Sequence, residues 1–254
     1  MRTIFDVALQ PRPDLSNACR DFLSQNAHRE GCLKAPLLCG YDLTVPQRPL
    51  LHLTDYQRIY QVVYSVLEAS EIAITHRACI FFAAAGMMIL RKHYGLPATI
   101  SAGCLALMVD EQKTNVVVYG RVEDGAFVNN ENAFHAWVEC DGWLIDFMAP
   151  IMGDALREDC CDWEVPRCML QKRLERRMAT IGDIQRGGEF FIEHNYALTE
   201  SLIDGQGVQF GDLMNVCLAW FRRPPKPLKA MAMGDSHGVP KNLVARAPSI
   251  DGVW

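Results

Sequence analysis

The stretch ACIFFAAAGMMILRKHY, residues 78–94, limits most strongly how this chain can fold. From Ala78 to Leu90 nearly every position is apolar, so a helix here has no face suited to water and belongs in the centre of a domain. The run is shorter than the ~20 residues that a membrane span needs. Gly95 provides a natural end, because glycine readily takes the left-handed conformation that closes a helix. The sequence therefore predicts a buried central helix.

Four segments after Gly95 have the composition of β-strands. They are Ala98–Val109, Asn115–Tyr119, Phe134–Cys140 and Trp143–Phe147. Asp141-Gly142 joins the last two as a two-residue hairpin turn, which makes those two strands antiparallel. A central helix packed on an antiparallel β-sheet is an α+β fold, and we predict that class.

Further helices are predicted on both sides of this core. Thr54 and Gln57 form a capping box that opens an amphipathic helix over Asp55–Ala69. The segments predicted beyond Pro150 are a charged helix, Met169–Met178, and two amphipathic segments, Phe190–Ile203 and Val208–Phe221. The charged helix would present a basic face, which we expect to be solvated surface rather than an anion site. That face consists of Lys172, Arg173, Arg176 and Arg177.

We assign residues 54–222 to the main domain, residues 1–53 to an N-terminal lead-in and residues 223–254 to a C-terminal tail. The lead-in is expected to hold a helix over Leu15–Ala27 and an extended loop over Pro36–Pro49. The tail is expected to lie on the surface or to be partly disordered.

Charge and composition exclude several classes of partner. The net charge of −5 and the pI near 5.8 give no general attraction to nucleic acid or to an anionic membrane. The N-terminal sequence MRTIFDVALQ lacks the pattern of a secretory signal, so we expect a cytoplasmic protein. With 50% hydrophobic residues the chain can build a core without disulfides or metal, and no cofactor is predicted. The oligomeric state is left open.

The chain has ten cysteines at irregular spacings, and no two form a Cys-x-x-Cys pair. Without an export signal they are expected to be reduced thiols rather than a disulfide framework. Cys160-Cys161 and Cys168 with His194 lack the spacing of a zinc site, so we expect ordinary thiols there as well. Most of the ten should therefore behave as small buried hydrophobic side chains.

Cys79 differs from the others because it lies in the first turn of the predicted central helix. The unpaired N–H groups and the dipole of a helix N-terminus stabilise negative charge, and the thiolate is the nucleophilic form of cysteine. Taken alone, a cysteine in such a place is more often a core side chain than a nucleophile. The assignment therefore depends on whether a base lies beside it.

A histidine and an aspartate on the predicted hairpin can supply that base. If the hairpin closes on Asp141-Gly142, Trp137 lies opposite Asp146, and His135 lies one pair further along the same face. His135 and Asp146 are then diagonal neighbours, about 7–8 Å apart by backbone and within reach of a hydrogen bond. Such a carboxylate orients an imidazole as a general base. A one-residue bulge in the turn would move Asp146 to the other face and remove this geometry.

Residues 75–150 resemble the core of the transglutaminase-like families within the papain-like superfamily. The motifs that carry the resemblance are Cys79, Gly95-Leu96-Pro97-Ala98, His135-Ala136-Trp137-Val138-Glu139, Gly142-Trp143, and Asp146 followed by Pro150. The resemblance implies a papain-like/transglutaminase-like fold. It also implies that Cys79 is the nucleophile, that His135 is the general base and later the acid, and that Asp146 orients the imidazole.

Two positions depart from the pattern of these families. His76-Arg77-Ala78 precedes the nucleophile instead of Gly-x, and Ala73 stands where the papain branch has its oxyanion-hole glutamine. The second oxyanion donor is therefore not identified, and the candidates are the Cys79 N–H, Gln57, Gln61 or an indole. His76 and Arg77 either attract an anionic group or lower the pKa of the thiol, or else they are capping and solvated side chains.

Three hypotheses follow for function. The first is a cysteine-dependent acyl-transfer enzyme that forms a thioester at Cys79 and acts on a peptide, amide or other acyl substrate. Water as the acceptor makes it a peptidase or amidase, which we favour, and an amine makes it a transglutaminase or acyltransferase. The second is a non-catalytic binding protein on the same fold. The third is a structural α+β domain whose resemblance is accidental.

Overall fold

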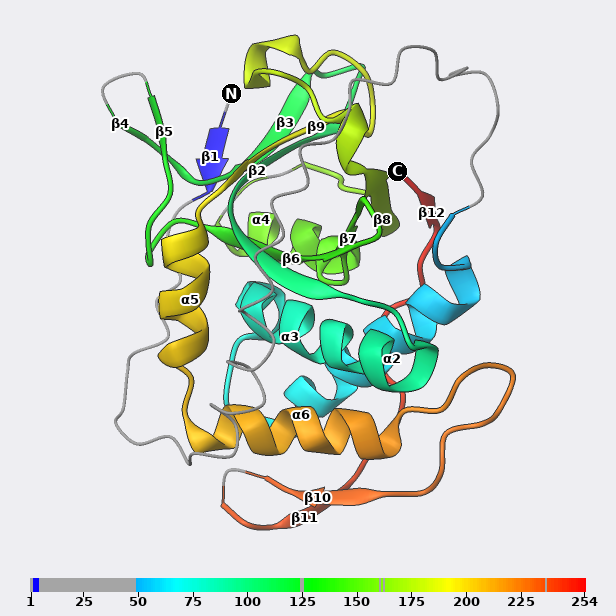
Figure 1. Ribbon diagram of the computed structural model, residues 1–254. Helices are drawn as coiled ribbons and strands as arrows, with labels where there is room; N and C mark the ends of the chain where they lie inside the picture. The colour runs from blue at the N-terminus through cyan, green and yellow to red at the C-terminus, as the bar shows by residue number, and fades with distance from the viewer. Residues whose placement is uncertain (1, 5–48, 124–125, 160, 162, 236) are drawn as a thin grey trace.

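The computed structural model describes residues 2–4, 49–123, 126–159, 161, 163–235 and 237–254. The helix predicted over Leu15–Ala27 and the loop predicted over Pro36–Pro49 fall outside these residues, apart from Pro49 itself. In the described part, several helices pack against a mostly antiparallel sheet, so the predicted α+β class is confirmed (Figure 1). None of the described helices is both long and apolar enough to cross a membrane.

One sheet organises the fold, and its strands follow the order β1-β3-β2-β6-β7-β8-β12, with β9 paired to β2 outside that path. β1 pairs with β3, and β12 with β8, in parallel; the other pairs are antiparallel. β4–β5 and β10–β11 form two small separate sheets. The strand bounds are β1 Arg2–Ile4, β2 Thr99–Asp110, β3 Asn115–Tyr119, β4 Arg121–Glu123, β5 Ala126–Val128, β6 His135–Cys140, β7 Trp143–Asp146, β8 Cys168–Arg173, β9 Phe190–His194, β10 Ala232–Gly234, β11 Pro240–Asn242 and β12 Gly252–Val253.

β2 pairs with three other strands and so brings distant segments together. It pairs with β6 through its first half, with β9 through its middle and with β3 through its second half. The end of β3 and the start of β6 therefore meet along β2, where Tyr119 lies opposite Leu105 and His135 lies opposite Gly103. Alternate residues of a strand share a face, so Tyr119 and His135 point to the same side of the sheet.

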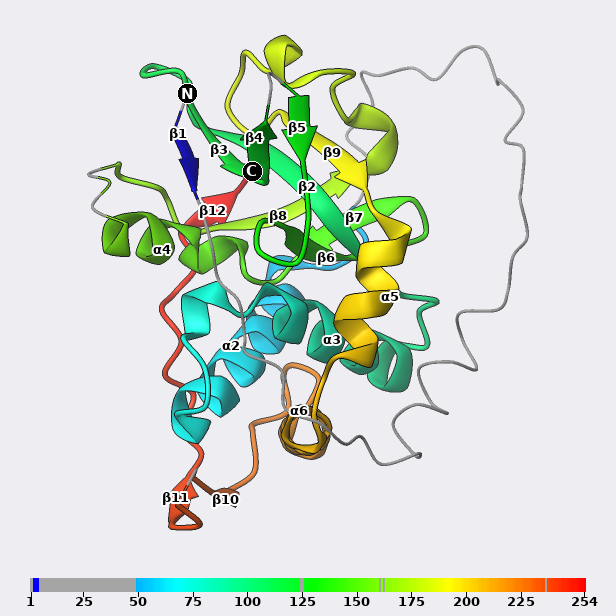
Figure 2. The same ribbon diagram turned by 90° about the vertical axis from the view of Figure 1, so that its left-hand side faces the viewer.

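Helices α2, α3 and α6 lie together beneath one face of the sheet, while α5 runs along its side (Figures 1 and 2). The helix bounds are α2 Leu53–Ser70, α3 Cys79–Ile89, α4 Met152–Glu158, α5 Tyr196–Asp204 and α6 Val208–Trp220. Every residue of α3 except Met88 is buried. A π-helical turn, Leu90–Tyr94, extends α3 as far as Gly95, which is left-handed with φ 68°. The predicted central helix and its glycine end are confirmed.

α3 approaches the β6–β7 hairpin closely at Gly86. A Cβ at this position would lie 2.3 Å from the ring of Phe147, so only glycine lets the two elements come this near. Phe147 directly follows Asp146 in the chain. The contact therefore fixes the distance between α3 and the strand that carries Asp146.

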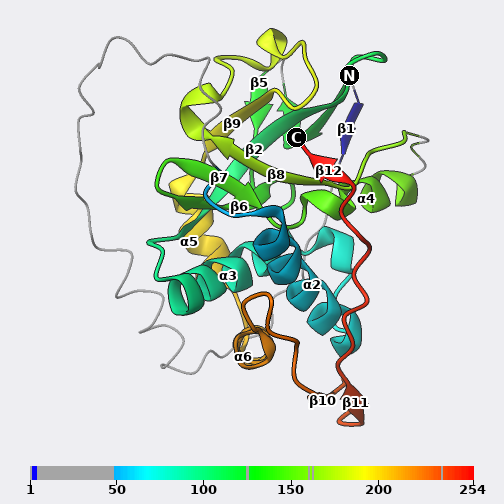
Figure 3. The same ribbon diagram turned by 90° about the vertical axis from the view of Figure 1, so that its right-hand side faces the viewer.

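The opposite face of the sheet carries a smaller apolar cluster, which Ile181 and Ile184 cover. The last residues of the chain return to the helical side, where Met233 and Leu243 are buried in the same core as α2 and α3. The chain then runs along α2 to β12, beside β8 (Figure 3). The domain boundaries stay a prediction.

The charged helix expected over Met169–Met178 is wrong. Residues Cys168–Arg173 form β8, which pairs with β7 on one edge and with β12 on the other, and a 3₁₀ turn, Leu174–Arg176, follows. The first four residues of β8 are buried between these neighbours, so tertiary pairing decides the conformation over local helix propensity. The basic side chains therefore do not share a helix face.

Two helix starts also differ from the expectation. α2 begins at Leu53, after His52 as N-cap, so Thr54 lies inside the first turn and the predicted capping box is absent from α2. The segment expected over Phe190–Ile203 divides into β9 and α5 at Asn195. The Asn195 side chain accepts a hydrogen bond from the Leu198 N–H, a helix-capping signal that the sequence analysis missed. The amphipathic segment expected over Val208–Phe221 forms the helix α6, which ends at Trp220.

Candidate active site at the head of the central helix

Cys79 is the first residue of α3 and follows a 3₁₀ turn, Thr75–Arg77. The side chain is 7% exposed, at the edge of the core. The N–H groups of Phe81 and Phe82 both donate to the Ala78 carbonyl, whereas those of Cys79 and Ile80 make no hydrogen bond to any other described residue. Free N–H groups of this kind are what a helix N-terminus offers to a negative charge. The predicted place of Cys79 is confirmed.

The β6–β7 hairpin has the register that the sequence predicts. Asp141 and Gly142 both take positive φ, at 49° and 76°, as a type I′ turn requires. Val138 pairs with Ile145, and Cys140 pairs with Trp143. No bulge interrupts this pairing, so the faces of the two strands stay in the predicted phase.

His135 and Asp146 meet on this hairpin as expected. Nε2 of His135 lies 2.8 Å from Oδ2 of Asp146, and the two side chains are 0% and 1% exposed. The other carboxylate oxygen, Oδ1, accepts a hydrogen bond of 2.8 Å from the Met148 N–H. The Tyr56 hydroxyl, from α2, donates to the Asp146 carbonyl. The aspartate is thus fixed from three sides.

The charge state of His135 follows from its neighbours. Burial alone would lower the pKa of His135, but the Asp146 carboxylate and then Cys79 raise it to about 10. The Asp146 carboxylate therefore favours the protonated form of the imidazole. Nδ1, the ring nitrogen not bonded to Asp146, is buried and has no hydrogen-bond partner of ordinary geometry among the described residues. This nitrogen is the one left for the thiol.

Burial governs the ionisation of several other described cysteines. Burial raises the pKa of Cys104 to about 12 and that of Cys140 to about 11, with Glu193 and Asp141 as secondary causes. Burial also raises the pKa of Cys217. These thiols stay protonated at neutral pH and are inert in the way buried cysteines usually are.

Tyr119 is a member of this site that the sequence analysis missed. Its ring stacks on the His135 ring, with centroids 4.3 Å apart and an interplanar angle of 25°. The hydroxyl is buried and has no hydrogen-bond partner among the described residues. Burial, followed by the charges of Asp146 and Cys79, raises the pKa of Tyr119 well above its usual value. The phenol therefore keeps its proton and stays available as a donor.

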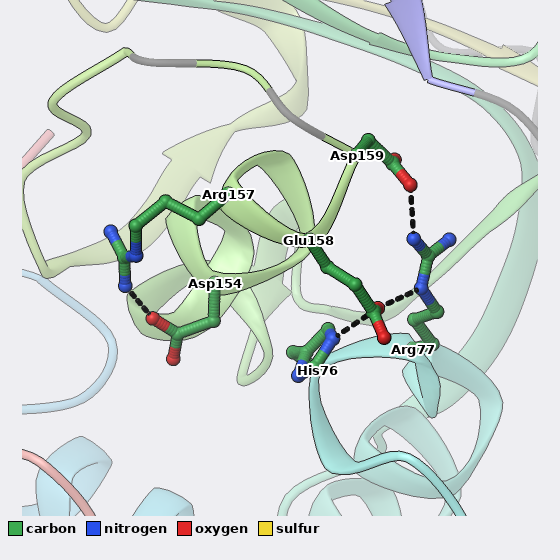
Figure 4. A network of polar contacts seen from close by, with 6 residues as sticks. All are labelled: His76, Arg77, Asp154, Arg157, Glu158 and Asp159. Carbon is green, nitrogen blue, oxygen red and sulfur yellow. Dashed lines mark hydrogen bonds and ion pairs between the residues drawn. The ribbon is translucent and has the colours of Figure 1, made fainter.

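A polar network fixes the turn that precedes Cys79 (Figure 4). Oε2 of Glu158 lies 2.8 Å from Nε2 of His76 and 2.8 Å from Nε of Arg77, and Arg77 also bonds Asp159. Glu158 ends α4, the helix that follows the hairpin. The Glu158 carboxylate is thus a hydrogen-bond partner of both His76 and Arg77, so neither side chain is simply solvated.

A cavity of about 550 Å³ opens beside Cys79, between α3 and the α5–α6 connection. Neither Gln57, Gln61 nor any tryptophan lines it, and the Trp137 indole N–H donates instead to Glu139. Of the candidate oxyanion donors named from the sequence, Cys79 alone lines this cavity.

No group of three or more metal-ligating side chains occurs in the described part of the chain. The sequence analysis considered Cys160, Cys161, Cys168 and His194 as a zinc site, and Cys160 lies outside the described residues. His194 instead makes a hydrogen bond with Glu139, on the same face of the sheet as His135.

Comparisons with known proteins show the family of the chain. The chain belongs to the family described as "Protein of unknown function (DUF2026)", whose model matches residues 52–254. A solved structure described as "The crystal structure of genomics APC5867" is 30% identical, with a TM-score of 0.70 over 82% of this chain and 98% of that chain. No curated protein matches the chain.

Proposed function

We propose that this member of the DUF2026 family is a cysteine-dependent acyl-transfer enzyme of papain-like, transglutaminase-like fold. Cys79 is its nucleophile, His135 its acid and base, and Asp146 the group that orients the imidazole. The observation that carries the proposal is the fully buried hydrogen bond between His135 and Asp146, on an imidazole that also interacts with Cys79. A plain structural domain has no need to bury a charged pair beside a thiol at a helix N-terminus.

The groups present suffice for two half-reactions. In the first, the thiolate of Cys79 attacks the acyl carbonyl and a carbon–sulfur bond forms. The carbon–nitrogen bond to the leaving amine then breaks, and the imidazolium of His135 gives its proton to that amine. In the second, His135 takes a proton from water, the hydroxide attacks the thioester, and the carbon–sulfur bond breaks. Asp146 keeps Nε2 protonated throughout and stabilises the imidazolium. The Cys79 N–H faces the developing oxyanion.

The acceptor decides the type of enzyme. Water makes the protein a peptidase or amidase, and a primary amine makes it a transglutaminase or acyltransferase. Water is the acceptor that we propose, since it is present at high concentration and needs no binding site of its own. The cytoplasm, which the sequence predicts, would keep the described cysteines as the free thiols that the structure contains.

The test is acylation with 4-nitrophenyl acetate, followed by rapid acid quench and peptide mapping. We expect one acetyl group on Cys79, and none on the Cys79→Ala protein. Cys140→Ala is the matched control. It removes a different buried thiol, which lies at the end of β6, and it should leave the acetylation of Cys79 unchanged. Acetylation of other residues with Cys79 unmodified would contradict the proposal and favour a non-catalytic binding protein on the same fold. Addition of a primary amine then shows whether the acetyl group is transferred to it or lost to water.

A further inference from the structure

The cavity beside Cys79 has the size of a small-molecule site. Its volume of about 550 Å³ falls within the ~300–1,000 Å³ that is typical of such sites. Four segments form its walls: the end of α2, the turn before α3, the first turn of α3, and the α5–α6 connection with the first half of α6. A strip that includes Phe134, just before His135, completes it. The cavity therefore adjoins both the nucleophile and the strand of the base.

Its interior is apolar. Phe81 lies two residues after the nucleophile on α3. Its ring contacts that of Phe210 of α6 edge to face, with ring centroids 5.2 Å apart. Leu67, Phe134 and Leu213 add further apolar surface. Side chains of this kind recognise hydrocarbon or an aromatic ring by burial, and they offer no partner to a charge.

The polar groups at the cavity do not suit an anionic ligand. Arg77 lines it, but its guanidinium is engaged by Glu158 and Asp159. Glu131 also lines it, accepts a hydrogen bond from Ser201 and would repel a carboxylate. The remaining polar side chains are neutral amides, Asn132, Gln206 and Gln209.

We infer that this cavity holds the acyl part of the substrate and that this part is an uncharged, apolar group. The inference rests on the proposed function, because it takes Cys79 as the atom that carries the acyl group. In a thioester mechanism the acyl part stays bonded to sulfur while the leaving group departs. A cavity that Cys79 itself lines therefore suits the part that remains.

A series of 4-nitrophenyl esters tests the inference: acetate, butyrate, hexanoate, octanoate, and the monoester of adipic acid as the charged member. Each rate constant is divided by that of a small free thiol with the same ester, which removes differences in intrinsic reactivity. We expect the normalised kcat/KM to rise by about fourfold per methylene until the cavity is full. The charged ester should react more slowly than hexanoate.

Two exposed isoleucines give a matched pair of variants. Ile72 lines the cavity and is 42% exposed, whereas Ile74 lies two residues away, is 50% exposed and does not line it. Because both side chains already face solvent, a glutamate at either position should leave the fold intact. Ile72→Glu should flatten the dependence on chain length, and Ile74→Glu should leave it as in the unaltered protein.

The outcomes separate the two proposals. Acylation of Cys79 with no dependence on chain length overturns the acyl-cavity inference and leaves the proposed function standing. Binding of octanamide to the Cys79→Ala protein, measured by calorimetry and weakened by Ile72→Glu, supports the cavity without any turnover. If no ester acylates Cys79 but octanamide binds in this way, the proposed function fails and the apolar site remains. Absence of both acylation and binding overturns both.

Discussion

The hydrogen bond between His135 and Asp146 makes a strong prediction for Asp146→Asn. An asparagine has one oxygen and one NH₂ group, whereas the two partners of Asp146, the His135 ring and the Met148 N–H, both donate to it. If the oxygen keeps the bond to Met148, the NH₂ faces Nε2, which must then lose its proton. If the amide is flipped, the NH₂ faces the Met148 N–H. The first orientation costs His135 its Nε2 proton, and the second places one donor against another in a buried site.

The magnitude follows from these two bonds, each 2.8 Å long. A neutral Nε2 forces the remaining ring proton onto Nδ1, so His135 can no longer hold the imidazolium state. We expect the acylation rate to fall by about 10³–10⁴-fold, as happens when an oriented base takes the wrong tautomer. One unsatisfied buried donor should also lower the free energy of unfolding by about 1–3 kcal/mol. Asp146→Ala, which leaves the imidazole without its carboxylate, should lower it by about 3–5 kcal/mol.

The assay is the burst of nitrophenol from 4-nitrophenyl acetate, with circular dichroism and urea unfolding as tests of the fold. Asp141→Asn is the matched control, because Asp141 is exposed in the turn of the same hairpin and asparagine tolerates its left-handed φ of 49°. The Asp141→Asn protein should keep the acylation rate and the free energy of unfolding of the wild type. A folded Asp146→Asn protein that acylates at the wild-type rate would falsify the role of Asp146, and with it the triad.

Three further predictions test the surroundings of the site. Near neutral pH, Cys79 should react with iodoacetamide before the other described thiols, as peptide mapping will show; labelling elsewhere with Cys79 untouched contradicts the nucleophile assignment. Tyr119→Phe removes a buried hydroxyl without a partner and should raise the free energy of unfolding by about 1 kcal/mol, whereas Tyr56→Phe should lower it by a similar amount; urea unfolding decides. Burial alone would raise the pKa of Glu139, but hydrogen bonds from His194 and Trp137 lower it. The Glu139 carboxylate therefore contributes to the free energy of unfolding above pH 4.5, and this contribution is lost as the pH falls through the lowered pKa. Urea unfolding between pH 6 and 3 should therefore show the stability gap between wild type and Glu139→Gln narrowing below pH 4.5; a gap that does not change contradicts the shift.

The parts of the site that sequence predicts are those that local rules determine. Asp141-Gly142 selects a type I′ turn, this turn sets the register, and the alternation of strand faces places His135 and Asp146 on one side. The apolar run likewise fixes the head of α3 at Cys79, because nothing before it continues the buried pattern. Each of these inferences uses only neighbours in the chain.

The parts that sequence missed depend on partners far away in the chain. Tyr119 reaches His135 only because β3 and β6 pair with neighbouring stretches of β2, which no local pattern reveals. β8 was mistaken for a helix because the charged residues at its end suit a helix, while its buried half is held extended by β7 and β12. Strand pairing between distant segments decides both cases, and in β8 it also overrides local propensity.

The polar network in front of α3 shows how one continuous segment can position the whole site. Residues 135–159 carry the base, the aspartate and then α4, whose last residue Glu158 holds Arg77. Cys79 and its turn come from elsewhere, and residues 135–159 hold them at two points: Phe147 packs against Gly86, and Glu158 bonds Arg77. The nucleophile is thus tied on two sides to the strand pair that carries its base. The distance between thiol and imidazole is then set by packing and ion pairs together, so loosening the network should misplace Cys79 without touching His135 or Asp146.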